Sequence, residues 1–153
     1  MATNTIIQYL ETTDGEGTAY GVGVSNRRQV ETYIAGAAIA ANDLVAFDFS
    51  ASSDGAAAVT VIKADAGSTD SVAVVGFALN AATAAGDKVD VTIAGIHISA
   101  NVNGSVAKGD RLSISATGGQ ADTYVNADTV PIIGYALEDD SGNIASVMVI
   151  KQF

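Results

Sequence analysis

The segment VVGFAL at Val74–Leu79 recurs as IIGYAL at Ile132–Leu137, and this pair is the strongest fold signal in the chain. Three further segments, starting at Ile39, Thr83 and Val106, share a turn of small residues, an aspartate and then alternating apolar residues. Alternation with a period of two is the pattern of a half-buried β-strand. The recurrence predicts two related β units, about 39–98 and 106–151, that close against each other into one small barrel.

The composition supports an all-β fold. The larger aliphatic residues are 17 Val and 13 Ile against only 5 Leu, and β-branched side chains fit a pleated surface. A chain of 153 residues is the usual size of one domain and can bury a core without disulfides or metals. The absence of Cys excludes thiol catalysis and thiolate zinc sites.

The chain divides into an amino-terminal arm at residues 1–33 and a β-barrel body at residues 34–153. The first segment is polar and has four glycines between Gly15 and Gly23, so it is a poor helix former and contributes little to a core. Its apolar anchors include Tyr9, Leu10 and Tyr20. The alternative is a frayed terminus, since chain ends are often unstructured.

The charge limits the classes of partner. Lys and Arg number 7 against 17 acidic residues, for a net charge of −10, and this argues against nucleic-acid binding. The one basic pair, Arg27 and Arg28, is interpreted as a docking contact to an acidic partner surface or, alternatively, as a solvated pair. We expect neither a membrane span nor a signal peptide, because the sequence has no long apolar run and its start lacks a basic segment followed by an apolar one.

The residues do not favour an enzyme. The single histidine, His97, has no nucleophile motif near it, so we expect a structural or surface histidine. A small β-barrel hydrolase using His97 and a nearby Asp is the least supported hypothesis. The stretch Asp139–Asn143 departs from a calcium loop because Ile144 stands where that loop needs Gly. We therefore predict no catalytic residues, no metal and no cofactor.

Two strands carry ambiguous patterns. In Lys88–Ile98 the large residues change parity after Ile93, so a bulge at Gly95 is predicted to return Ile96 and Ile98 to the inward face. The last strand, Ile144–Ile150, is apolar on both faces. It is either central and covered on both sides, or one of its faces meets another subunit.

The turns AAGD (Ala84–Asp87) and KGD (Lys108–Asp110), together with VVGFAL and IIGYAL, resemble the small decoration or cement proteins of tailed-phage heads. This resemblance implies a compact β-barrel or β-tulip-like body and a homotrimer at three-fold positions of an icosahedral shell. It also implies an arm that grips neighbouring subunits of the major capsid protein. It supplies no catalytic residue.

The resemblance therefore predicts a structural protein that binds the outer surface of the capsid and stabilises the shell. The expected location is the virion, after synthesis in the host cytoplasm, and the expected partners are the major capsid protein and other copies of this chain. The candidate capsid-binding residues all lie in the arm: Tyr9, Leu10, Tyr20, Arg27 and Arg28. The alternative is a receptor- or glycan-binding β module, which would expose aromatic residues in a groove, but only 6% of residues are aromatic and Trp is absent.

Overall fold

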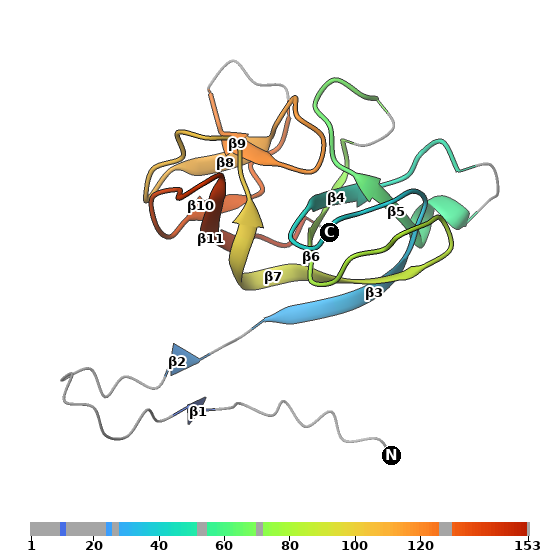
Figure 1. Ribbon diagram of the computed structural model, residues 1–153, viewed down its shortest axis with the longest axis horizontal. Helices are drawn as coiled ribbons and strands as arrows, with labels where there is room; N and C mark the ends of the chain where they lie inside the picture. Colours follow the sequence, from blue (N-terminus) through green and yellow to red (C-terminus); the bar gives the residue numbers. More distant parts are fainter. Residues whose placement is uncertain are drawn as a thin grey trace.

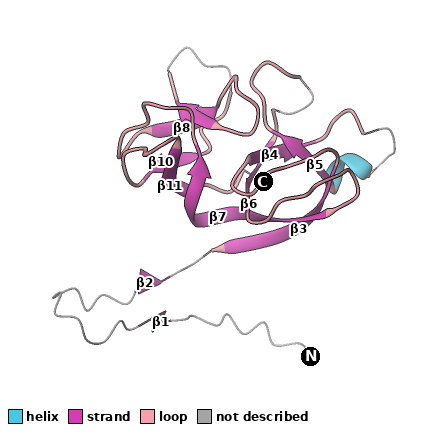
Figure 2. Cartoon of the chain, viewed as in Figure 1, coloured by secondary structure: helices cyan, strands magenta, loops and turns pink. Residues whose placement is uncertain are grey.

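The computed structural model describes residues 10–11, 24–25, 28–51, 55–69, 72–125 and 130–152. In these ranges strands and turns dominate, and the only helical element is a single 3₁₀ turn (Figure 2). The elements are β1 (Leu10–Glu11), β2 (Val24–Ser25), β3 (Gln29–Ala35), β4 (Leu44–Phe47), η1 (Ala56–Ala58), β5 (Thr60–Lys63), β6 (Val74–Ala78), β7 (Lys88–Asn101), β8 (Arg111–Ile114), β9 (Ala121–Thr123), β10 (Gly134–Ala136) and β11 (Ile144–Val149). The predicted all-β class is confirmed.

The first half of the chain forms a closed five-stranded barrel. Its strands follow the order β3-β5-β4-β6-β7, and β3 closes the barrel by pairing with β7 in the antiparallel sense and with β5 in the parallel sense. Strand β3 begins at Gln29. The expected arm–body boundary at residue 33 therefore falls inside a barrel strand. Strands β1 and β2, which lie in the segment expected to be the arm, pair with each other.

The second half repeats this strand order, and the carboxyl-terminal half of the long strand β7 takes the place that β3 has in the first half. Strands β9, β8, β10 and β11 lie side by side in that order, and β11 pairs with the carboxyl-terminal half of β7 (Figure 1). An isolated parallel bridge between Val102 and Ala121 links β9 back to the end of β7. The two related units thus share the 14-residue strand β7. They do not close into one common barrel as expected, because β7 pairs with β3 and β6 along its first half and with β11 along its second.

Hydrogen bonds confirm that the two repeated segments occupy equivalent strands. The N–H of Ala78 in β6 donates to the carbonyl of Asp43 at 2.9 Å, and the N–H of Ala136 in β10 donates to the carbonyl of Asp110 at 2.9 Å. The same equivalence holds for the cross-strand partners, since Phe77 is opposite Leu44 and Tyr135 is opposite Arg111. Internal repetition in the sequence therefore corresponds to repetition in three dimensions.

The three aspartate turns share one local geometry. Each carboxylate accepts a hydrogen bond from the backbone N–H three residues earlier: Ala40 to Asp43 at 2.8 Å, Ala84 to Asp87 at 3.0 Å, and Ala107 to Asp110 at 3.0 Å. The residue before each aspartate has positive φ and is Asn42, Gly86 or Gly109. Gly and Asn adopt this conformation at the lowest cost, which explains why the turn is built from these residues.

Two hydrophobic cores follow from the strand alternation. One fills the closed barrel, and the other lies between the barrel and the second unit. Strand β4 serves both, since Val45 belongs to the first core and Leu44 and Ala46 to the second. Phe77, which is fully buried, packs in the second core with strands of the other unit. The units therefore pack against each other through the outer face of the first barrel.

Asp43 connects the two units at their junction. Its carboxylate is nearly buried and forms an ion pair with Lys63 Nζ on β5 at 2.9 Å. Asn101, at the end of β7, donates its side-chain N–H to the other carboxylate oxygen at 2.9 Å. The charge is compensated, as a buried carboxylate requires.

The predicted bulge at Gly95 does not return Ile96 and Ile98 to the inward face. Gly95 has positive φ, but the buried positions continue from Ile93 to His97 without a change of parity. The parity changes only at Ser99, so that Ala100 is the next buried residue. His97 is consequently 2% exposed, whereas Ile98 is 67% exposed.

Candidate interaction surface

His97 is a buried structural side chain. Its Nδ1 lies 3.1 Å from Thr92 Oγ1 and its Nε2 lies 3.2 Å from Asn42 Oδ1. The ring stacks on Phe77 with centroids 5.3 Å apart. A neutral imidazole satisfies both contacts, because Nε2–H donates to the amide oxygen and Nδ1 accepts from the hydroxyl. Each of the two ring nitrogens thus has a protein partner, and the ring is closed off from solvent.

Burial makes His97 a source of pH-dependent stability. Desolvation and, to a lesser extent, the charge of Arg28 lower the pKa of His97 from 6.5 to about 4. The unfolded chain therefore binds a proton at higher pH than the folded chain, so stability is complete above about pH 6.5 and falls as the pH drops towards 4. The loss is up to roughly 3 kcal/mol.

The corresponding prediction compares the natural chain with His97→Asn. The variant loses the ring stacking and is less stable at pH 7.5, by about 1–3 kcal/mol. In urea unfolding between pH 7.5 and 4, the difference in the free energy of unfolding between the two proteins narrows as the pH falls. A difference that stays constant across this range would contradict the assignment of a buried neutral histidine.

Within the described residues, no group of three or more His, Asp or Glu side chains is placed to hold a metal ion. In the same residues, no helix has the length and apolar character needed to cross a membrane.

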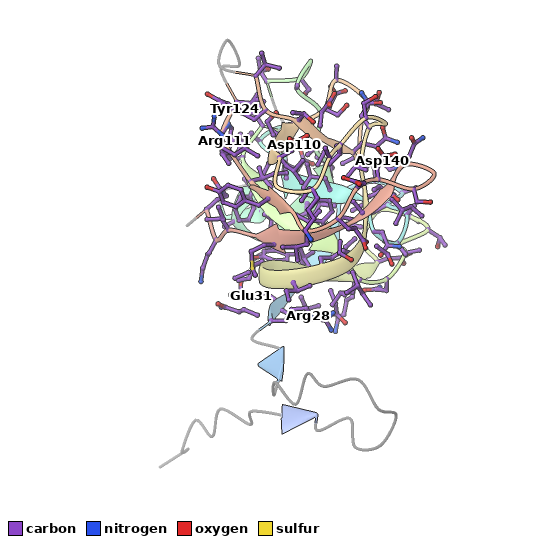
Figure 3. The ribbon with its side chains drawn as sticks, turned by 90° about the vertical axis from the view of Figure 1, so that its left-hand side faces the viewer. Arg28, Glu31, Asp110, Arg111, Tyr124 and Asp140 are labelled. Atoms are coloured by element: carbon purple, nitrogen blue, oxygen red, sulfur yellow. The ribbon has the colours of Figure 1, made fainter. Side chains whose placement is uncertain are left out.

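The candidate capsid-binding residues are described only in part. Tyr9, Tyr20 and Arg27 lie outside the described residues. Leu10 is in β1, where only its backbone is described. Arg28 is exposed and directly precedes β3, below the body in the view of Figure 3. The capsid-binding role of these five residues stays a prediction.

An exposed row of side chains crosses the second unit. Tyr135 on β10 is directly opposite Arg111 on β8 and Met148 on β11, and Met148 is opposite Ile96 on β7. Residues directly opposite each other in antiparallel strands project from the same face of the sheet. Tyr135 is 43% exposed and Met148 is 37% exposed. We call these four residues, together with Ile98 two positions beyond Ile96, the outer row.

The exposure of the outer row shows whether the last strand, β11, is covered on both of its faces. In β11 the side chains of Ala145, Val147 and Val149 are buried, whereas Ile144 and Met148 are exposed. The strand is therefore covered on one face, and its other apolar face is open in the single chain. The sequence signal was the presence of apolar residues on both faces of 144–150, but it did not single out Tyr135 or Met148.

The six described aromatic residues are distributed over both units. Tyr33 and Phe77 are buried, and Phe47 packs edge-on against Tyr33 with ring centroids 5.9 Å apart. Phe49 is exposed just after β4, in the first unit. Tyr124 and Tyr135 belong to the second unit, where the guanidinium of Arg111 lies 5.4 Å from the Tyr124 ring centre. Tyr135 is also opposite Arg111, so Tyr124 and Tyr135 lie beside the same arginine, whereas Phe49 lies in the other unit.

Comparison with solved structures gives the same architecture. The chain is similar to the head fiber gp8.5 N base of bacteriophage phi29, with a TM-score of 0.53 and 19% sequence identity. The similarity covers 80% of this chain and 94% of that chain. No family model matches the sequence. No curated protein matches it either. At this identity the likeness establishes the fold.

Proposed function

We propose that this protein is a structural component of a tailed-phage head. In this proposal it is a decoration protein that binds the outer surface of the icosahedral capsid as a homotrimer at three-fold positions and stabilises the shell. The observation that carries the proposal is the similarity to a phage head fiber base over 94% of that chain. The resemblance of the repeated turns and of VVGFAL and IIGYAL to decoration proteins supports the same role.

The geometry of the body fits a role in binding rather than in chemistry. The one histidine is enclosed by protein partners, while a row containing Tyr, Met, Ile and Arg is exposed. Aromatic residues, Met and Arg are enriched in protein–protein interfaces. The partners proposed are the major capsid protein, reached through the arm, and further copies of this chain.

The test is binding to capsid shells from the phage that encodes this chain. Purified protein is mixed with expanded shells that lack it, and the shells are sedimented. We expect saturable co-sedimentation in multiples of three copies per three-fold position, and decorated shells that withstand a higher temperature than bare shells. An unrelated acidic β protein of similar size serves as the control. No co-sedimentation at any protein concentration would refute the proposed function.

A further inference from the structure

The sheet that carries the outer row is almost free of charge. Across β8, β10, β11 and residues 95–101 of β7, Arg111 is the only charged side chain. The chain as a whole has 17 acidic residues. The acidic groups near this sheet lie at its border, namely Asp122 on the neighbouring strand β9 and Glu138, Asp139 and Asp140 in the turn after β10.

The same face exposes a contiguous set of large apolar side chains. Tyr135, Met148 and Ile96 are cross-strand neighbours, and Ile98 is the most exposed large apolar residue in the described part of the chain. Single exposed apolar residues are common on soluble proteins, whereas a contiguous apolar row indicates a contact surface. The opposite face of β11 is buried in the core, so the core of the single chain is covered without any further contact to the row.

The two ends of this face have opposite charge. In Figure 3, Arg111 and Tyr124 lie at the left and Asp140 lies at the right of the face turned towards the viewer. Glu138 and Asp139, next to Asp140 in the β10–β11 turn, are exposed. Hydrogen bonds from Ser146 lower the pKa of Glu138, so this carboxyl group is ionised at neutral pH.

We propose that the outer row is the contact between copies of this chain, arranged head to tail, with Arg111 of one copy facing the acidic 138–140 turn of the next. A head-to-tail contact uses two different surface regions and closes a ring when the rotation permits, as in a trimer. A two-fold contact would pair Arg111 with the acidic turn as well, so the three-fold arrangement is taken from the proposed homotrimer and the charges fix only which groups meet. The inference deepens the proposed function, because it rests on the homotrimer and locates its interface.

The test is the mass of the natural chain and of Met148→Glu in solution. Sedimentation velocity of the natural chain is expected to give three times 15.3 kDa. In Met148→Glu, a charge enters the middle of the apolar row, and we expect the midpoint of trimer dissociation to rise at least about tenfold in concentration. A second variant, Ile98→Ser, removes apolar contact without adding charge and is expected to shift the midpoint in the same direction.

The matched control is Phe49→Glu, which places the same charge at an exposed apolar residue of the first unit. Circular dichroism and thermal melting confirm that each variant is folded. A natural chain that is monomeric at all concentrations, folded row variants that remain trimeric, or equal dissociation of the control would each overturn the assignment. Capsid co-sedimentation separates this inference from the proposed function. A trimer that does not bind shells refutes the decoration role and leaves the interface standing. A monomer that decorates shells refutes the interface and the homotrimer and leaves the decoration role standing.

Discussion

Replacing Gly76 with alanine is expected to lower the free energy of unfolding by at least about 3 kcal/mol, a large part of what stabilises a domain of this size. A Cβ atom at Gly76 would lie 2.0 Å from the carbonyl oxygen of Thr92 and 2.8 Å from its carbonyl carbon. Both atoms are backbone of β7, which pairs with β6 at this point. Relief of the overlap requires the shared strand to move, so both units are affected.

Gly134 provides an internal check on this expectation. It is the equivalent glycine of the second unit, and its added Cβ would lie 2.3 Å from the carbonyl oxygen of Met148 on β11. Gly134→Ala should therefore destabilise the protein to a similar degree. Gly118→Ala is the control, because nothing lies within 4 Å of its added Cβ, and its effect should stay within about 0.5 kcal/mol. Urea unfolding measures all three, and a Gly76→Ala protein as stable as Gly118→Ala would contradict the close approach of the strands.

Deletion of residues 1–28 is expected to weaken binding to capsid shells more than about a hundredfold while leaving a folded trimer. The truncation ends directly before β3, so every strand of both units is retained. The proposed trimer contact, the outer row, also lies entirely within the retained residues. Three arms on one trimer act together through effective concentration, and their joint loss therefore has a large effect. Co-sedimentation with expanded shells and sedimentation velocity measure the two properties separately.

A double substitution tests whether the positive charge of the arm contributes to capsid binding, separately from the length of the arm. Replacing Arg27 and Arg28 together with Ala removes the basic pair and keeps the length of the chain. If the pair meets an acidic capsid surface, this variant binds less tightly than the natural chain at low salt, and the difference shrinks as salt is added. A truncated protein that decorates shells with undiminished affinity would instead place the capsid contact on the body.

Local sequence signals predicted the elements of the fold well. The sequence signal of the turn is a small residue followed three positions later by an aspartate, with Gly or Asn directly before the aspartate. It produces the same turn, with positive φ before the aspartate, at Asp43, Asp87 and Asp110. The turn is predictable from local sequence because it is stabilised by hydrogen bonds within four consecutive residues. The equivalence of VVGFAL and IIGYAL was predictable because both segments follow the same aspartate turn and carry the same local pattern, although Phe77 is buried between the units and Tyr135 is 43% exposed.

The sequence pattern did not predict correctly which side chains are buried where burial depends on residues far away in the chain. Alternation indicated that Ile96 and Ile98 return to the inward face, but the structure buries His97 between them and leaves Ile98 in solvent. The imidazole is held there by Asn42, which is 55 positions away in the chain, and it stacks on Phe77. No sequence pattern around position 97 contains these partners.

The sequence by itself determined the all-β class, the internal duplication and the unusual acidity of the chain, because composition and turn chemistry act over a few residues. Only the tertiary structure decided that the two units share β7 and that β11 is covered on one face. A strand with apolar residues on both sides is compatible with either coverage, and the choice depends on which other strands pack against it. The outer row consequently emerged only when β8, β10, β11 and β7 were aligned in register.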